Sequence, residues 1–312
     1  MTEALYALLV GPFKDMGSSP AFFAEVLIGG IFAGLMYSLV ALGFVLIFKA
    51  SGVFNFAQGV MVLFAALTLV GLMERGMPVA LALAITAGVM ILLALLIERI
   101  VLRPLVNQAQ IILFMATIGL NFFLEGFGEM LWGSNVKRLD VGIPDTSFKV
   151  AGVLINRLEL TAAITAAVLV SILAIFFQRT RIGRALRAVA DDHEAALSIG
   201  IPLKTIWVVV WSVAGLVAIV AGIMWGAKSG VQFSLSLVAL KALPVLILGG
   251  FTSVPGAIVG GLIIGVGEKL AEVYWGPLVG GAIENWFAYV LALVFLLFRP
   301  QGLFGERIIE RV

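Results

Sequence analysis

Long uninterrupted apolar stretches constrain the fold of this chain more than any other feature. A transmembrane helix needs about 20 predominantly apolar residues to cross the hydrocarbon core of a bilayer, and several stretches reach that length. Only 12% of the 312 residues are charged, about half the fraction typical of soluble domains. Transmembrane β-barrels would show segments of about ten residues with alternating polarity, a pattern that this sequence lacks. The sequence therefore predicts an all-α, polytopic transmembrane helical bundle.

Polar breaks divide the apolar stretches into nine predicted spans, within a range of about eight to ten. We expect them to form a single transmembrane domain over residues 1–312. Short or glycine-rich segments at membrane depth either line a pathway or pack closely against neighbouring helices, and both alternatives stay open here. The predicted spans are Ala21–Phe48, Val53–Met73, Met77–Ile97, Ile111–Trp132, Leu158–Gln178, Ile206–Gly226, Leu237–Gly250, Gly256–Glu272 and Asn285–Phe298.

The distribution of Lys and Arg predicts the orientation, because short cytoplasmic loops carry an excess of these residues. The loop of residues 179–205 is the most basic, with Arg179, Arg181, Arg184, Arg187 and Lys204, so we place it in the cytoplasm. Counting nine spans from this loop puts the N-terminus outside, in the periplasm, and the C-terminus in the cytoplasm. The polar segment 133–157 is then the longest external loop, and it either docks an external partner or simply connects two spans.

Several classes of chemistry lack the residues they require. The chain has no Cys, and its single histidine, His193, has no second His or Cys with which to bind a metal. The apolar stretch Gly261–Lys269 lacks the Gly-Lys-Ser/Thr ending of a phosphate-binding loop. Nucleic-acid binding is excluded because the chain offers few polar faces. We therefore expect no catalytic residue, no metal site and no cofactor bound by this chain.

Polar residues inside or beside the apolar segments are candidates for a solute pathway. They are Asn55, Gln58, Thr117 and Asn121, together with the ionisable Lys241. Intramembrane ionisable groups are costly and suggest function, whereas amide and hydroxyl groups can also hydrogen-bond between helices. A self-sufficient ion-coupled carrier is an alternative class of protein for these residues. That class predicts gradient-driven uptake by the isolated chain, but few central carboxylates or histidines are present to form a proton relay.

Small residues recur at four-residue spacing, which lets helix backbones approach closely in lipid. Close packing needs no transport function, and it is the expected role of each pair. The pairs are Gly30 with Gly34, Gly222 with Gly226, Gly256 with Gly260, Gly261 with Gly265, and Gly276 with Gly280.

The stretch Arg179–Ile201 predicts a short charged helix on the cytoplasmic side. Its Ala, Leu and Arg content favours helix, and Gly200 followed by Pro202 supplies a stop. Its core, EAALSIG, resembles the Glu-Ala-Ala-x-x-x-Gly signature of ABC importer permeases, whose coupling helix docks on an ATPase. The resemblance implies that the coupling residues are Gly183, Arg184, Arg187, Asp191, Glu194, Ala195, Ala196 and Gly200.

Further blocks, in the same order along the chain, resemble the permeases of branched-chain amino-acid (Liv-type) ABC importers, and the H-type subunit more closely than the M-type. They extend from about Glu25 to Gly305. The blocks are GLMYSLVALGFVLIFKASGVFNFAQG, IERIVLRPL, ATIGLNFFL, GRALRAVADDHEAALSIGI, LILGGFTSVPGAIVGGLIIGVGE and RPQGLFG. Gln58 departs from the pattern, because the family often has His at this position. The resemblance therefore leaves open whether this chain prefers the family's commonest solute.

The resemblance implies a type II ABC importer permease in a bacterial cytoplasmic (inner) membrane. Its expected partners are an M-like permease subunit forming a heterodimer, two ATPase subunits that use ATP and Mg, a periplasmic solute-binding protein, and membrane lipid. The expected solute is a branched-chain amino acid. Urea, short amides and small carboxylates are the alternatives within the same transporter class.

Overall fold

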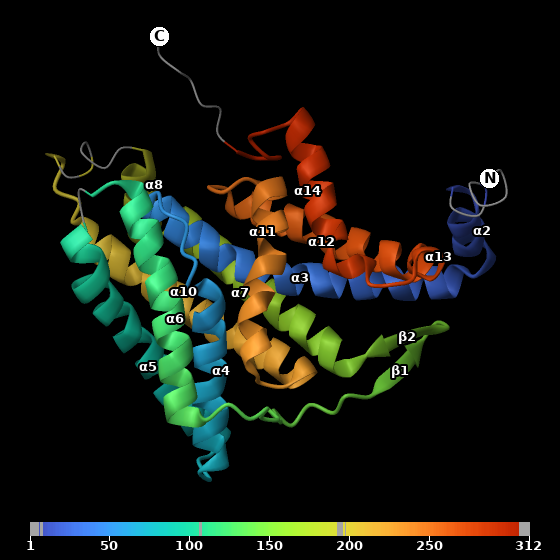
Figure 1. The fold of residues 1–312 in the computed structure, drawn as a ribbon, viewed down its shortest axis with the longest axis horizontal. Coiled ribbons are helices and arrows are strands. Elements are labelled where there is room, and N and C mark those ends of the chain that lie inside the picture. Colours follow the sequence, from blue (N-terminus) through green and yellow to red (C-terminus); the bar gives the residue numbers. More distant parts are fainter. Residues whose placement is uncertain (1–5, 7–8, 106–107, 192–195, 197, 306–312) are drawn as a thin grey trace.

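The computed structural model describes residue 6 and residues 9–105, 108–191, 196 and 198–305. Within these residues, nine apolar helical segments correspond one by one to the nine predicted spans (Figure 1). They are α3 (Pro20–Ser51), α4 (Gln58–Glu74), α5 (Val79–Leu96), α6 (Gln110–Trp132), α7 (Arg157–Arg179), α10 (Leu203–Ser229), η3 with α11 (Phe233–Leu237 and Val238–Gly249), α12 (Val254–Tyr274) and α14 (Phe287–Phe298).

Length divides these segments into two groups. In the described chain, six helices are long and apolar enough to cross a membrane, whereas α4, the η3–α11 segment and α14 are shorter. Helix α4 begins only at Gln58, because residues 53–57 form a loop, and every side chain from Gln58 to Leu72 is buried. A short helix of this kind is compatible with a bilayer because protein, rather than lipid, surrounds it.

Helix α5 continues beyond its predicted end as a π-helix, η1 (Ile97–Leu102), and a short 3-10 helix, η2 (Arg103–Leu105). The sequence places a polar break here because Glu98 and Arg103 are charged. In the structure the Arg103 Nε and Nη2 atoms donate to the two Glu98 carboxylate oxygens at 3.2 and 3.1 Å. This two-pronged pairing satisfies the buried carboxylate within the helical segment.

Two predicted glycine pairs form the seam between α3 and α12. A methyl group on Gly34 would lie 2.6 Å from the Gly261 carbonyl oxygen, and one on Gly265 would lie 2.3 Å from the Gly34 nitrogen. Gly30 makes the same kind of backbone approach to Val266. The seam therefore requires residues without a side chain, as predicted for close packing in lipid.

The prediction of close helix packing is wrong for the pair Gly276 and Gly280. Gly276 begins the four-residue helix α13 (Gly276–Val279), and Gly280 is its left-handed C-cap with φ of 93°. A methyl group on Gly280 would meet nothing within 4 Å. The glycine is needed for its backbone angle, which other residues adopt at a cost, and spacing alone does not distinguish the two uses.

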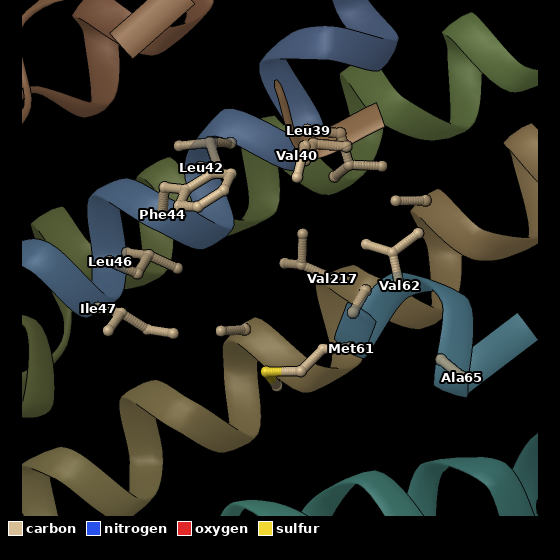
Figure 2. Packing of buried hydrophobic residues seen from close by; sticks show 14 of the residues in the cluster. Leu39, Val40, Leu42, Phe44, Leu46, Ile47, Met61, Val62, Ala65 and Val217 are labelled. Carbon is tan, nitrogen blue, oxygen red and sulfur yellow. The ribbon is translucent and has the colours of Figure 1, made fainter. Parts of the chain in front are cut away.

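The core centres on α3, α4 and α10. Figure 2 shows Leu42 and Leu46 of α3, Met61 and Val62 of α4, and Val217 of α10 in one cluster. The same cluster of buried residues extends to members of α5, α6, α7, α11, α12 and α14. Burial of these apolar side chains against one another leaves the outer helices to face lipid.

One end of the bundle gathers several helix ends and loops. The Trp207 indole nitrogen donates to the Ala50 carbonyl at 3.1 Å, which joins α10 to α3. The backbone nitrogens of Leu303 and Phe304 donate to the carbonyls of Leu248 and Gly249, which joins the C-terminal segment to the end of α11. Helix α8 (Arg181–Asp191) lies at this end (Figure 1).

The opposite end carries a β-hairpin that the all-α prediction did not include. Strands β1 (Ser147–Val150) and β2 (Val153–Asn156) pair antiparallel within the predicted external loop. Their two-residue turn has positive φ at Ala151 (50°) and Gly152 (90°), as the tight turns of twisted hairpins require. The strands have too few residues to be recognised by periodicity, so the sequence alone indicated only a polar loop.

Candidate functional site

Helix α8 follows α7 after a single-residue break at Thr180. The Thr180 hydroxyl accepts from the Gly183 backbone nitrogen at 3.1 Å, and the Thr180 carbonyl accepts from the Arg184 nitrogen. Leu186 and Val189 are buried, so α8 packs one apolar face on the bundle. Its polar face is left on the surface, which is the arrangement of an amphipathic helix suited to a soluble partner.

Gly183 and Arg187 hold α8 against the end of α7. A methyl group on Gly183 would lie 2.0 Å from the Phe177 carbonyl oxygen, so only glycine permits this approach. Arg187 Nη1 donates to the same Phe177 oxygen at 2.6 Å. The bond satisfies a carbonyl in the last turn of α7, where no intrahelical donor follows. Gly183 and Arg187, two of the predicted coupling residues, therefore position α8.

The other predicted coupling residues lie in different settings. Glu194 and Ala195 lie outside the described residues, as does His193, and Asp191 is the last residue of α8. Ala196 is 1% exposed and faces the bundle. Arg184 and Gly200 are exposed, and Gly200 has φ of 85°, as expected of a glycine that ends a helix.

Ile199 was not singled out from the sequence, yet it is 73% exposed at this end of the molecule. A large aliphatic side chain between Ser198 and Gly200 in a polar loop is the pattern that could have identified it. Single exposed apolar residues are common on protein surfaces, so it is the position of Ile199 among the predicted coupling residues that makes it a candidate contact. Ile199, Arg184 and Gly200 together are called the α8 docking surface below.

Three of the five predicted pathway residues are enclosed and organise the loop before α4. The Asn55 side-chain oxygen accepts from the Ala57 nitrogen at 3.1 Å. Thr117 of α6 accepts from the Phe56 nitrogen at 3.1 Å and donates to the Phe114 carbonyl. Gln58 is fully buried beside Gly43. Their contacts explain how the loop is held inside the bundle.

Asn121 is the fourth predicted pathway residue, and it lies on a groove of about 210 Å³. It sits midway along α6, one of the helices long enough to cross a membrane. We call this the α6–α11 groove. Four phenylalanine rings, from α3, the loop before α4 and α6, line it together with aliphatic side chains and few polar ones. Its lining includes Phe44, Phe54, Phe56, Phe122, Asn121, Glu125 and Ser236.

Lys241, the fifth predicted residue, forms an ion pair inside the bundle. Its Nζ lies 2.9 Å from Glu268 Oε1, and the side chains are 28% and 5% exposed. The Tyr37 hydroxyl donates to the same oxygen at 3.0 Å. The three residues come from α11, α12 and α3, so the cluster joins three helices at one point. The sequence indicated that Lys241 is costly in lipid, but it did not indicate that Lys241 pairs with Glu268.

The described residues contain no group of three or more His, Asp or Glu side chains placed to hold a metal. The features present are a mostly apolar groove midway along α6, a buried polar cluster and an amphipathic helix at the basic end.

A bundle with this many apolar helices is a multi-pass membrane protein. Residues 26–299 match the family described as branched-chain amino acid transport system / permease component. The match covers most of the chain, which belongs to this family. The family is one of transport subunits and not of enzymes.

Curated relatives match over nearly their whole lengths. The chain is 28% identical over 305 residues to the high-affinity branched-chain amino acid transport system permease protein BraD of Pseudomonas aeruginosa, covering 93% of this chain and 98% of that protein. It is 29% identical over 311 residues to the corresponding protein LivH of Escherichia coli K12, with the same coverage. A probable LivH of Methanocaldococcus jannaschii is 26% identical over 312 residues, 94% of each chain.

The solved structure of PsaBC from Streptococcus pneumoniae in complex with Fab is a more distant likeness. It has a TM-score of 0.44 and 14% sequence identity over 93% of this chain and 95% of that chain. A likeness at this level does not place any site residue.

Proposed function

We propose that this protein is the transmembrane permease subunit of an ATP-binding-cassette importer that moves branched-chain amino acids, or a related small solute, into the cytoplasm. The family match over residues 26–299 carries the proposal. Such a permease works with ATPase subunits, which use ATP and Mg, and with a solute-binding protein. The chain acts as a single transmembrane domain in the bacterial inner membrane.

The α8 docking surface is the proposed contact with the ATPase. Exposed Ile199 supplies an apolar contact, and Arg184 supplies charge at its edge. Ala196 faces inward, so its contribution is to keep the docking segment close to the bundle. ATP-driven closure then moves the permease between two states, which requires the ATPase to bind those states with different affinity.

The α6–α11 groove is the proposed solute path. A branched aliphatic side chain fits a wall of phenylalanine rings, while Asn121 and Ser236 offer polar atoms for the amino and carboxyl groups. Ligand sites are commonly of this kind, mostly apolar with a few placed polar groups. Asn55, Gln58 and Thr117 act from behind the groove by shaping the loop that carries Phe54 and Phe56.

The basic end of the bundle is the proposed cytoplasmic side. With nine spans counted from this side, we expect the C-terminus in the cytoplasm, the N-terminus in the periplasm and the β-hairpin on the side of the binding protein. A permease subunit of the M type is the proposed second half of the transmembrane pair. Basic residues at the cytoplasmic end include Lys49, Arg99, Arg103, Arg179, Arg181, Arg184, Arg187, Lys204 and Arg299.

Reconstitution tests the proposal. The chain is purified alone and with its M-type partner, ATPase subunits and binding protein, and leucine uptake into proteoliposomes is measured with and without ATP. ATP-dependent uptake by the full set alone is expected. Gradient-driven uptake by the isolated chain would overturn the proposal, and an assembled complex active only on urea, amides or small carboxylates would change its solute.

Docking is tested separately. Replacing Ile199 with Asp places a charge in the proposed apolar contact, and we expect ATPase subunits to be lost from the affinity-purified complex. Leu278 is also an exposed aliphatic residue, but it lies in α13, at the opposite end of the bundle. The change Leu278→Asp is therefore the matched control. Equal retention of ATPase by both variants would contradict the docking role.

A further inference from the structure

A cavity of about 200 Å³ lies between α8 and the ends of α3, α7 and α12. Two of its lining side chains are cations, Lys49 of α3 and Arg187 of α8. No carboxylate is among the lining residues in the part of the chain that the structure describes. The cavity is distinct from the α6–α11 groove, with which it shares no lining residue.

Within the described residues, each cation uses only part of its hydrogen-bonding capacity. Lys49 Nζ makes a long contact of 3.4 Å to the Thr252 carbonyl, and Arg187 Nη1 donates to the Phe177 carbonyl. Neither forms an ion pair with a described carboxylate. An ammonium has three donors and a guanidinium five, so both retain donors. Two partly buried positive charges that pair with no carboxylate among the described residues favour an anion.

The walls and position of the cavity indicate which anion fits. Leu46, Phe177, Val254 and Pro255 give it an apolar lining beside the two cations. All of these residues lie within about two turns of helix ends, the depth at which lipid phosphates meet the hydrocarbon core.

One side of the cavity borders the exposed surface of α7. Gln178 of α7 lines it, and Ile172 and Ile175, one or two turns earlier on the same helix, are exposed on the outer surface of the bundle. An acyl chain can therefore lie along α7 while a headgroup enters the cavity.

We propose that this cavity binds the phosphate of an anionic phospholipid, held by Lys49 and Arg187. Basic pockets between transmembrane helices at the cytoplasmic face bind acidic headgroups in this way. The first turn of α12, capped by Ser253, adds a weaker positive dipole. The assignment to the cytoplasmic leaflet rests on the proposed function, whereas the binding site itself does not.

Binding would have a structural consequence for α8. Lys49 belongs to α3 and Arg187 to α8, so one phosphate contacting both would link the docking helix to the longest helix of the bundle. Gly183 and Leu186 of α8 line the same cavity. Lipid composition would thereby adjust how firmly α8 is seated.

The experiment measures lipid binding to the full-length chain, independently of transport. Purified protein in detergent is titrated with phosphatidylglycerol or with phosphatidylcholine of the same acyl chains, and thermal stabilisation is recorded. We expect phosphatidylglycerol to stabilise the wild type more strongly. Lys49→Gln and Arg187→Gln should each weaken its apparent affinity about five-fold, and Lys49→Arg should preserve it.

Lys204→Gln is the matched control, because Lys204 is exposed at the same end and does not line the cavity. Equal affinity of Lys49→Gln and wild type, or equal loss in Lys204→Gln and Lys49→Gln, would overturn the proposal. Inorganic phosphate is titrated in parallel. Stabilisation by phosphate alone to the same extent would assign the site to a free anion instead of a lipid.

Discussion

The seam between α3 and α12 offers the sharpest test of the packing. Gly34→Ala would place a methyl carbon 2.6 Å from the Gly261 carbonyl oxygen and 2.9 Å from the Leu262 Cα. Carbon atoms in favourable contact lie about 3.5–4.0 Å apart, so the two helices must separate by about 1 Å. Gly265→Ala meets the backbone of Gly34 even more closely, at 2.3 Å.

The expected free-energy change combines two opposing effects. Overpacking costs about 1–3 kcal/mol, and a gap of up to about 1 Å along the seam forfeits a quarter to a half of each contact's dispersion energy. The gain in helix propensity from Gly to Ala returns about 1 kcal/mol. We therefore expect net destabilisation of about 1–2 kcal/mol for Gly34→Ala, and more for Gly265→Ala.

Gly29 is the control on the same helix, because a methyl group there would meet nothing within 4 Å. Gly29→Ala should be neutral or stabilising by up to about 1 kcal/mol. Thermal unfolding of the three variants in one detergent, followed as loss of the monodisperse chromatographic peak, gives their order. If Gly34→Ala and Gly265→Ala unfold at or above the temperature of Gly29→Ala, the close seam is refuted.

Three further predictions concern polar side-chain contacts. Lys241→Met leaves the Glu268 carboxylate without its cation and should destabilise the protein by about 3 kcal/mol, the lower end for a broken buried pair, because the Lys241 side chain is 28% exposed. Adding Glu268→Gln to this variant should restore part of the thermal stability, and strictly additive losses would contradict the pairing. Thr117→Val removes the hydroxyl that accepts from the Phe56 nitrogen and should lower stability by about 1–3 kcal/mol. Thr165→Val affects only a bond within α7 and should not lower stability by this amount, so equal unfolding temperatures of the two variants would argue against the loop contact. Asn156→Ala removes the N-cap of α7 and should cost about 1 kcal/mol, and an unchanged melting temperature would show that the cap contributes nothing.

Hydropathy located the helical segments well because the bilayer imposes their length and polarity. A run of about 20 apolar residues has few alternatives to a membrane helix, so Ala21–Phe48 and Leu158–Gln178 lie inside α3 and α7. The external hairpin was missed, since four-residue strands carry too little pattern. The extension of α5 was missed too, because it depends on the ion pair between Glu98 and Arg103.

The candidate sites, too, could be predicted from the sequence only in part. The basic segment and Gly200 of the docking loop were recognisable from sequence, since charge excess and helix stops are local. The outward direction of Ile199 and the inward direction of Ala196 were not, because they depend on how the segment lies on the bundle. Asn121 was found as a polar residue within a span, but the phenylalanine wall beside it comes from three separate stretches of the chain.

By itself, the amino-acid sequence determined the class of fold, the position of each apolar helix and the membership of a permease family, since all three depend on local composition or on ordered blocks. Only the tertiary structure decided which polar residues meet. Lys241 and Glu268 join across 27 positions, and Lys49 and Arg187 share a cavity although their helices are far apart in the sequence. Such contacts depend on how the helices rotate and cross. The close backbone approach at residues such as Gly34 and Gly265 sets this geometry, and hydropathy does not encode it.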